Sequence, residues 1–152
     1  MVGSGNKSIL ARVSIVNPNG YIVLDEYVKP TAVVTDYRDF VSGIRKRDLD
    51  NGKDFNSVRN QVYNLLRGSI LIGHSLQFDL DVLNLDHPEH HRRDLAKYEP
   101  CRRNGQPVAL KTLARDYLGR HIQTGEHNSV EDAKACMDLY LKVAADWERN
   151  YR

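Results

Sequence analysis

A short apolar run between two helix-forming segments constrains the fold of this chain more than any other feature. Residues 69–73 read Ser-Ile-Leu-Ile-Gly, and a continuous apolar run of this length is typical of a strand that is buried on both faces of a sheet. Apolar residues recur at helical spacing over 55–66, Gly68 follows as a helix-ending residue, and a second helix is expected over 76–83. This order predicts an α/β fold.

The first part of the chain reads as a β-hairpin. The segments 9–16 and 21–28 are rich in β-branched and aromatic residues, and residues 17–20, Asn-Pro-Asn-Gly, join them. An Asn-Gly pair between two such runs is a strong hairpin signal. The chain is therefore expected to open with an antiparallel pair of strands.

Two further helices are expected nearer the carboxyl end. Residues 84–108 are rich in His, Arg, Pro and Asn and are interpreted as an irregular connection, after which a short helix over 110–118 ends at Gly119. The last helix carries an apolar stripe that must lie against the core: Val130, Ala133, Met137, Tyr140, Ala144 and Trp147. The complete order predicts a mixed sheet flanked by helices. Such a sheet needs a parallel partner for the strand at 69–73, and no strand of that type precedes residue 8.

Composition limits the class of protein. The chain has 152 residues, of which 41% are hydrophobic and 28% charged, so one domain spanning 1–152 is expected. No apolar run approaches the roughly 18 residues of a membrane span, and no membrane partner is expected. The net charge of +2 falls short of the strongly basic balance typical of DNA-binding domains. Cys101 and Cys136 have no metal-ligand spacing and are interpreted as reduced packing residues.

Asp79, His127 and Asp132 stand where the expected framework can bring them together. Asp79 and Asp132 fall in the first turns of two helices, and His127 lies in the loop before the last helix. Carboxylates at such positions can hold divalent cations, and a nearby His can accept a proton from a metal-bound water. Structural interpretations compete with this one: Ser129 and Asp132 fit a capping box, His127 fits a solvated loop, and Asp79 suits the positive end of its helix. On pattern alone, the cap is the preferred interpretation of Asp132.

Two motifs resemble those of a nuclease family. The segment Gly73–Leu83, G-H-S-L-Q-F-D-L-D-V-L, resembles the second motif of the DEDDh 3′→5′ exonucleases, in the branch of RNA exonuclease 4 and the interferon-stimulated exonuclease. The segment Gly125–Tyr140 resembles the third motif of that branch through its H-x-x-x-x-D core. Further similarity at Thr35–Arg38 and Arg93–Tyr98 extends the resemblance nearly from end to end.

This resemblance implies a ribonuclease H-like fold and a site for two Mg²⁺ or Mn²⁺ ions about 3.5–4 Å apart. Asp79 and Asp132 would be metal ligands and catalytic residues, and His127 would be the general base that deprotonates the attacking water. Three further residues would bind substrate: Met1, Arg38 and His74. Arg38 would contact the terminal ribose, where a 2′-hydroxyl distinguishes RNA from DNA.

The resemblance breaks at the family's first motif, D-C-E-M-V-G, because this sequence begins with Met1-Val2-Gly3. The Asp and Glu of that motif would precede Met1, so the two-ion site would be incomplete and the chain alone would have little activity. We therefore expect an exonuclease domain that is truncated at its amino end, with the central first strand missing or vestigial. The hairpin and the strand at 69–73 would then either stay apart around a poorly filled gap or pair directly.

The resulting interpretation is a monomeric 3′→5′ exonuclease domain that acts on the 3′ ends of RNA or single-stranded DNA, in RNA processing. The alternative is a catalytically inactive relative that binds nucleic acid ends or a protein partner. Resemblance to the RNA exonuclease 4 branch implies a location in the nucleus, with the nucleolus and the cytoplasm as alternatives.

Overall fold

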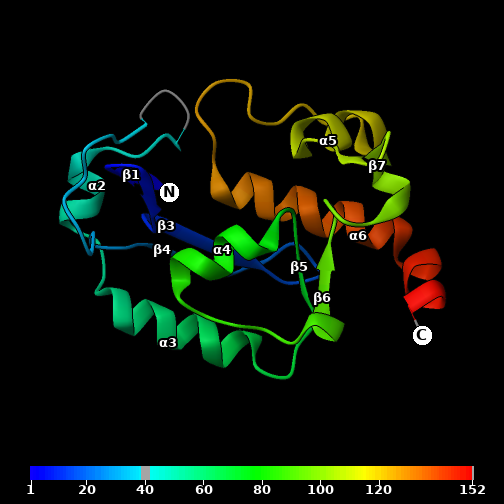
Figure 1. The fold of residues 1–152 in the computed structure, drawn as a ribbon, viewed down its shortest axis with the longest axis horizontal. Helices are drawn as coiled ribbons and strands as arrows, with labels where there is room; N and C mark the ends of the chain where they lie inside the picture. Colours follow the sequence, from blue (N-terminus) through cyan, green and yellow to red (C-terminus); the bar gives the residue numbers. More distant parts are fainter. Residues whose placement is uncertain (39–41, 152) are drawn as a thin grey trace.

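The computed structural model describes residues 1–38 and 42–151 and has an α/β architecture of short strands and longer helices (Figure 1). The strands are β1 (Val2–Ser4), β2 (Lys7–Ile9), β3 (Arg12–Val16), β4 (Ile22–Tyr27), β5 (Leu71–Gly73), β6 (Arg92–Asp94), β7 (Arg102–Arg103) and β8 (Gln106–Pro107). The α-helices are α2 (Lys46–Asp50), α3 (Phe55–Leu66), α4 (Leu76–Leu83), α5 (Leu110–Leu118) and α6 (Ser129–Tyr151), and the 3-10 helices are η1 (Glu89–His91) and η2 (Glu99–Cys101).

The central hairpin is formed by β3 and β4. The two strands pair antiparallel with Ser14 opposite Asp25. In the turn, the Asn17 side chain accepts hydrogen bonds from the backbone N–H groups of Asn19 and Tyr21, both at 3.0 Å, which is the local hydrogen bonding that makes Asn a turn residue. The expected antiparallel hairpin is confirmed.

A second, smaller hairpin precedes it. β1 and β2 pair antiparallel with Gly3 opposite Ser8, and this hairpin shortens the strand expected over 9–16. The chain leaves β2 at Ile9 and enters β3 at Arg12, and Leu10 and Ala11 between them are buried in the core.

The helices that flank the strands match the expected ranges. α3 begins after Asp54, whose carboxylate accepts the backbone N–H of Ser57 at 3.1 Å and so caps the helix. It buries Val58 and Val62 and ends before Gly68, whose φ of +76° is a conformation that glycine adopts without strain. α4 and α5 also occupy the ranges that the apolar periodicity predicts.

β5 has a parallel partner that sequence reasoning missed. β6 pairs with β5 in parallel, with Ile72 opposite Arg93 and Gly73 opposite Asp94, and it lies within residues 84–108, which were expected to be irregular. That expectation was wrong because β6 reads Arg-Arg-Asp and shows no apolar run. Arg93 is nevertheless buried, and its guanidinium donates to the Glu148 carboxylate of α6 at 2.6 Å and 3.0 Å.

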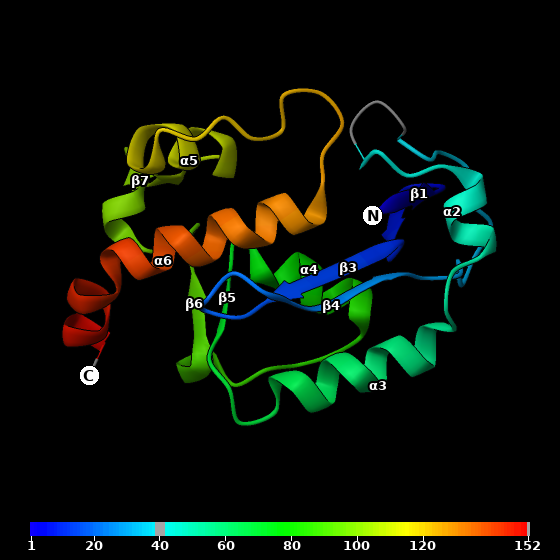
Figure 2. The ribbon, with the colours of Figure 1, turned by 180° about the vertical axis from the view of Figure 1, so that it is seen from behind.

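The two strand pairs remain separate, which is the first of the two alternatives that the sequence predicted. Within the described residues, β3 pairs with β4 and β5 pairs with β6, so the antiparallel and parallel halves of the expected mixed sheet are not joined. α6 packs against both β3 and β5. α4 lies in front of β3 in Figure 1 and behind it in Figure 2. Residues of β3, β5, α4 and α6 together line a cavity of about 660 Å³.

The buried face of α6 is shifted from the expected stripe. Trp147 is buried and stacks on Tyr98 with ring centroids 4.0 Å apart. The other buried residues of this helix are Ala135, Cys136 and Leu139. The rest of the predicted stripe is only half-buried. Ala133 and Met137 belong to it and line the cavity, so part of the apolar stripe faces open space instead of packed side chains. None of the helices in the described part of the chain is both long and apolar enough to span a membrane.

Candidate active site

One cavity collects the residues that the sequence singled out. Asp79 reaches it from the first turn of α4, Asp132 from the first turn of α6, and His127 from the loop that precedes α6. The buried thiol of Cys136 lies within electrostatic reach of both carboxylates, which raise its pKa after the larger effect of burial. Asp79, His127 and Asp132 therefore converge on one pocket.

The Asp79 carboxylate has a strongly perturbed pKa. Asp79 is an exposed residue that lines the cavity, and desolvation of its carboxylate by the surrounding protein raises its pKa to about 6. The amino-terminal ammonium of Met1 opposes the shift, and Asp94 adds to it. Perturbation of this kind by desolvation and a charged neighbour is common in functional sites.

The position of Asp79 depends on Asp94, a residue that sequence reasoning did not select. Asp94 ends β6 and is buried. Its carboxylate accepts backbone hydrogen bonds from Ser75 at 2.8 Å, Leu76 at 3.0 Å and Ala96 at 2.9 Å. Ser75 itself provides no side-chain cap and has a φ of +59°, so Asp94 caps α4 from a neighbouring strand. Because the contact is tertiary, the local sequence holds no signal for it.

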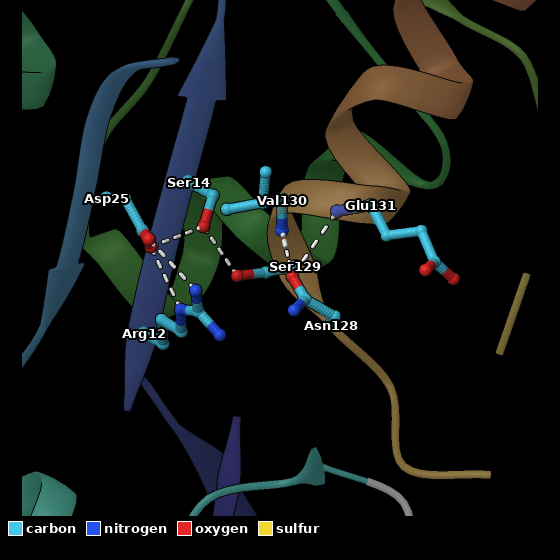
Figure 3. Close-up of polar contacts among 7 residues, drawn as sticks. All are labelled: Arg12, Ser14, Asp25, Asn128, Ser129, Val130 and Glu131. Carbon is cyan, nitrogen blue, oxygen red and sulfur yellow. Dashed lines mark hydrogen bonds and ion pairs between the residues drawn. The ribbon is translucent and has the colours of Figure 1, made fainter.

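Asp132 does not form the capping box that the pattern favoured. The side chain of Asn128 accepts the backbone N–H groups of Val130 at 2.9 Å and Glu131 at 3.3 Å (Figure 3), so Asn128 is the capping residue and the box interpretation of Ser129 and Asp132 was wrong. The capping box does not form because the capping residue is Asn128, one position before the expected Ser129.

The Asp132 carboxylate is instead available to the cavity. It accepts a hydrogen bond from the Gln123 side chain at 3.0 Å. Desolvation raises its pKa, and the opposing effects of Gln123 and the charge of His127 are smaller. A carboxylate that is desolvated and held by a neutral amide is a candidate ligand for a bound cation.

Ser129 connects α6 to the hairpin of β3 and β4. Its hydroxyl lies 2.5 Å from the hydroxyl of Ser14 on β3, and Ser14 donates to Asp25 at 2.8 Å (Figure 3). The Asp25 carboxylate also accepts two hydrogen bonds from Arg12, each at 2.9 Å, and Arg12 lowers its pKa. Asp25 is thus held in a structural ion pair on the hairpin.

The loop that carries His127 packs closely against Gly43. Gly43 has a φ of +69°, and a Cβ at this position would lie 3.1 Å from the backbone oxygen of His127. An ion pair between Arg45 and Glu126 holds the same loop. These contacts place the His127 ring at the cavity, where its charge acts on Asp132.

The three residues expected to bind substrate line the same cavity. Burial lowers the pKa of the Met1 ammonium, and the neighbouring Arg38 lowers it further. The Arg38 side chain donates to the Ser8 hydroxyl at 3.0 Å. The His74 ring nitrogen Nε2 lies 2.7 Å from the Val108 carbonyl oxygen and donates to it. Met1 and Arg38 give one side of the cavity positive charge.

The carboxylates of the described residues that line the cavity are Asp79 and Asp132. Among residues 1–38 and 42–151, no group of three or more His, Cys, Asp or Glu side chains is arranged to hold a metal ion. Asp79 and Asp132 offer two carboxylates, which suit one hard cation whose other ligands are water or phosphate oxygens. Two divalent ions about 4 Å apart repel each other and need more carboxylate charge.

Comparison with known proteins identifies the class. Residues 7–140 match the RNase_T family, described as Exonuclease. This match covers well over half of the 152 residues, so the chain belongs to this exonuclease family.

Within that class, the chain is similar to proteins called RNA exonuclease 4. The relative from Mus musculus is 50% identical over 154 residues, which cover 97% of this chain and 35% of that protein. The relative from Saccharomyces cerevisiae is 43% identical over 151 residues, which cover 97% of this chain and 52% of that protein. The resemblance to this branch is confirmed, and the chain spans about a third to a half of the length of these relatives.

Solved structures confirm the ribonuclease H-like fold class. The Saccharomyces cerevisiae Pan2 pseudoubiquitin hydrolase-RNA exonuclease module in complex with AAGGAA RNA has a TM-score of 0.83 and 32% identity, over 93% of this chain and 25% of that chain. The Neurospora crassa Pan2 catalytic unit has a TM-score of 0.81 and 26% identity, over 94% of this chain and 25% of that chain.

Proposed function

We propose that this chain is the nuclease domain of a 3′→5′ exonuclease that hydrolyses RNA or single-stranded DNA from its 3′ end. The observation that carries the proposal is the convergence of Asp79, His127 and Asp132 on one cavity in a member of an exonuclease family. Similarity to RNA exonuclease 4, and to a Pan2 module in complex with RNA, supports RNA as the substrate and RNA processing as the role.

Each residue has a distinct part in the proposed reaction. Asp79 and Asp132 would hold Mg²⁺ or Mn²⁺, an ion that lowers the pKa of a bound water and neutralises phosphate charge. The His127 ring would take the proton of the attacking water, a role worth about 10²–10⁴ in rate. Asp94 acts through Asp79, because it holds the first turn of α4 in place.

The positive side of the cavity would receive the substrate. The Arg38 guanidinium and the Met1 ammonium line the cavity and would contact a terminal phosphate or ribose. His74 is held by its hydrogen bond to Val108 and would contact the terminal nucleotide at the cavity wall.

The test compares two forms of the chain. A form that carries the family's first motif, with Asp-Cys-Glu directly before Met1, should shorten RNA from its 3′ end in Mg²⁺ or Mn²⁺. The chain by itself should be far slower, because two carboxylates bind the ions weakly. In the extended form His127→Ala should lower the rate about 10²–10⁴-fold. An extended form that leaves RNA intact, or a His127→Ala variant with full activity, would overturn the proposal.

The small number of carboxylates favours one alternative. With no group of three or more potential ligands among the described residues, the chain could be a non-catalytic module that binds nucleic acid ends or a protein partner. Tight binding of RNA 3′ ends by an extended form that does not hydrolyse them would support this alternative.

We also propose that the domain is a monomer and works in the nucleus or nucleolus, with the cytoplasm as the alternative location. The location rests on similarity to the RNA exonuclease 4 branch. Sedimentation of the purified chain tests the first statement, and imaging of a fluorescent fusion of the whole protein tests the second.

A further inference from the structure

One strongly basic segment adjoins the cavity of the candidate active site. Residues 102–120 contain five Lys and Arg side chains and a single acidic one, Asp116, so this segment carries a net charge of +4. The whole chain carries only +2, so the remaining residues together carry −2. The segment comprises β7, β8 and α5, and its residues Ala109 and Leu110 line the cavity.

The other long helices that line the cavity do not offer such a surface to an anion. α4 contains Asp79 and Asp81 and no basic residue, and α6 contains five acidic and three basic residues. The one charged residue of α3 is Arg59, whose guanidinium donates to the Asn84 carbonyl oxygen at 3.1 Å and 2.8 Å. A phosphate backbone that leaves the cavity is therefore attracted most strongly towards α5.

Lys111 and Arg115 form the outer face of α5. Both are exposed, and their spacing of four residues puts them on the same side of the helix, about 6 Å apart along its axis. Lys111 directly follows Leu110 at the cavity wall, so this basic row begins at the cavity and leads away from it. β7 lies beside α5 in both views (Figures 1 and 2). Its exposed Arg103 extends the row, because Arg103 and Arg115 both donate to the Asp116 carboxylate.

The other two basic residues of the segment have structural partners. Arg102 donates to the Ala96 carbonyl oxygen at 3.3 Å, and Arg120 forms an ion pair of 2.8 Å with Asp138 of α6.

The basic row itself keeps an excess of positive charge. Among residues 1–38 and 42–151, no ion pair engages the Lys111 ammonium. The guanidinium groups of Arg103 and Arg115 share the single carboxylate of Asp116. An added anion can therefore neutralise charge along this row without displacing a buried contact.

We propose that the outer face of β7 and α5, with Arg103, Lys111 and Arg115, binds the phosphates of the RNA nucleotides that precede the 3′-terminal one. The inference rests on the proposed function, because it takes the terminal nucleotide to lie in the cavity beside Asp79 and Asp132. Contacts to phosphates position a strand without reading its bases, so this face holds RNA of any sequence.

Salt dependence gives the test its scale. Each phosphate that a basic side chain neutralises releases bound counterions. For a single strand, the slope of log K against log salt is about 0.7 per contact. Two contacts, to Lys111 and Arg115, therefore account for a slope of about 1.4.

The experiment measures binding of a 5′-fluorescein-labelled RNA of eight nucleotides to the chain by fluorescence anisotropy. EDTA is present, so metal-dependent hydrolysis does not occur, and KCl is varied from about 50 to 200 mM. The double variant Lys111→Gln/Arg115→Gln should lower the affinity at least tenfold at the lowest salt and reduce the slope by about 1.4. Asp116→Asn removes the single acid of the segment and should strengthen binding.

The matched control is Lys29→Gln, which removes the same charge elsewhere. Lys29 is exposed and lies beside the start of α3, where its backbone N–H donates to the Lys53 carbonyl oxygen at 2.8 Å. α3 and α5 lie on opposite sides of the molecule (Figures 1 and 2). This variant should keep the salt slope of the parent chain, and circular dichroism checks that all variants are folded.

Three results would overturn the proposal. They are equal losses of affinity in the double variant and in Lys29→Gln, an RNA that does not bind at about 50 mM KCl, and a peptide of eight glutamates that binds as tightly as the RNA. The last result would assign the face to an acidic protein partner. None of these readouts involves hydrolysis, so the inference can fail while the nuclease proposal stands. RNA that binds this face but is left intact by the extended form would overturn the nuclease proposal alone.

Discussion

Replacing Asp94 by Asn tests how the structure holds Asp79 in place. The Oδ1 atom of Asn would keep the acceptor position for Ser75 and Ala96, but its amide nitrogen would face the N–H of Leu76 and leave that buried donor unpaired. A hydrogen bond to a charged group contributes about 1.5–3 kcal/mol, and an unpaired buried donor costs about 1–3 kcal/mol. We therefore expect the free energy of unfolding to fall by about 2–4 kcal/mol.

The assay is urea denaturation followed by the fluorescence of Trp147, the single tryptophan of the chain. The control is Asp86→Asn, whose side chain is 96% exposed in its ion pair with Arg92 and should cost less than about 1 kcal/mol. If Asp94→Asn costs no more than this control, Asp94 does not cap α4 in the way that the hydrogen bonds indicate.

Three further changes test other parts of the structure. Gly43→Ala should lower the free energy of unfolding by about 1–2 kcal/mol, because of its positive φ and the nearby His127 oxygen; an unchanged urea midpoint would contradict this. In wild type the ionised Asp25 carboxyl stabilises the fold, and this stabilisation is lost as pH falls below 3.8 through the lowered pKa of the group. Asp25→Asn should remove this part of the pH dependence, and acid titrations that coincide for both proteins would contradict the prediction. Trp147→Ala should cost about 3–5 kcal/mol by circular dichroism, and a loss below 1 kcal/mol would mean that its packing matters little.

Local sequence patterns predicted the elements that depend on local chemistry. The Asn-Gly turn, the spacing of apolar residues in α3 and α4, and the position of Asp79 in the first turn of α4 all depend on neighbours in the chain. The convergence of Asp79, His127 and Asp132 came from the family motifs and is matched by the cavity in the structure.

Features that depend on distant residues could not be predicted. β6 is a strand because it pairs with β5 and because Arg93 is neutralised by Glu148, and neither partner is near in sequence. Asp94 caps a helix to which it does not belong. Asn128 caps α6 in place of its neighbour Ser129. Asn and Ser cap helices about equally well, so the local sequence does not choose between them. In each case, tertiary geometry selects among options that the local sequence leaves open.

The most direct test of the central claim is to locate Mn²⁺ by anomalous scattering in crystals of this chain soaked with the ion. We expect a peak in the cavity between Asp79 and Asp132, with His127 at its edge. No peak in the cavity at millimolar Mn²⁺, or a peak only at the hairpin carboxylates Asp25 and Glu26, would contradict it.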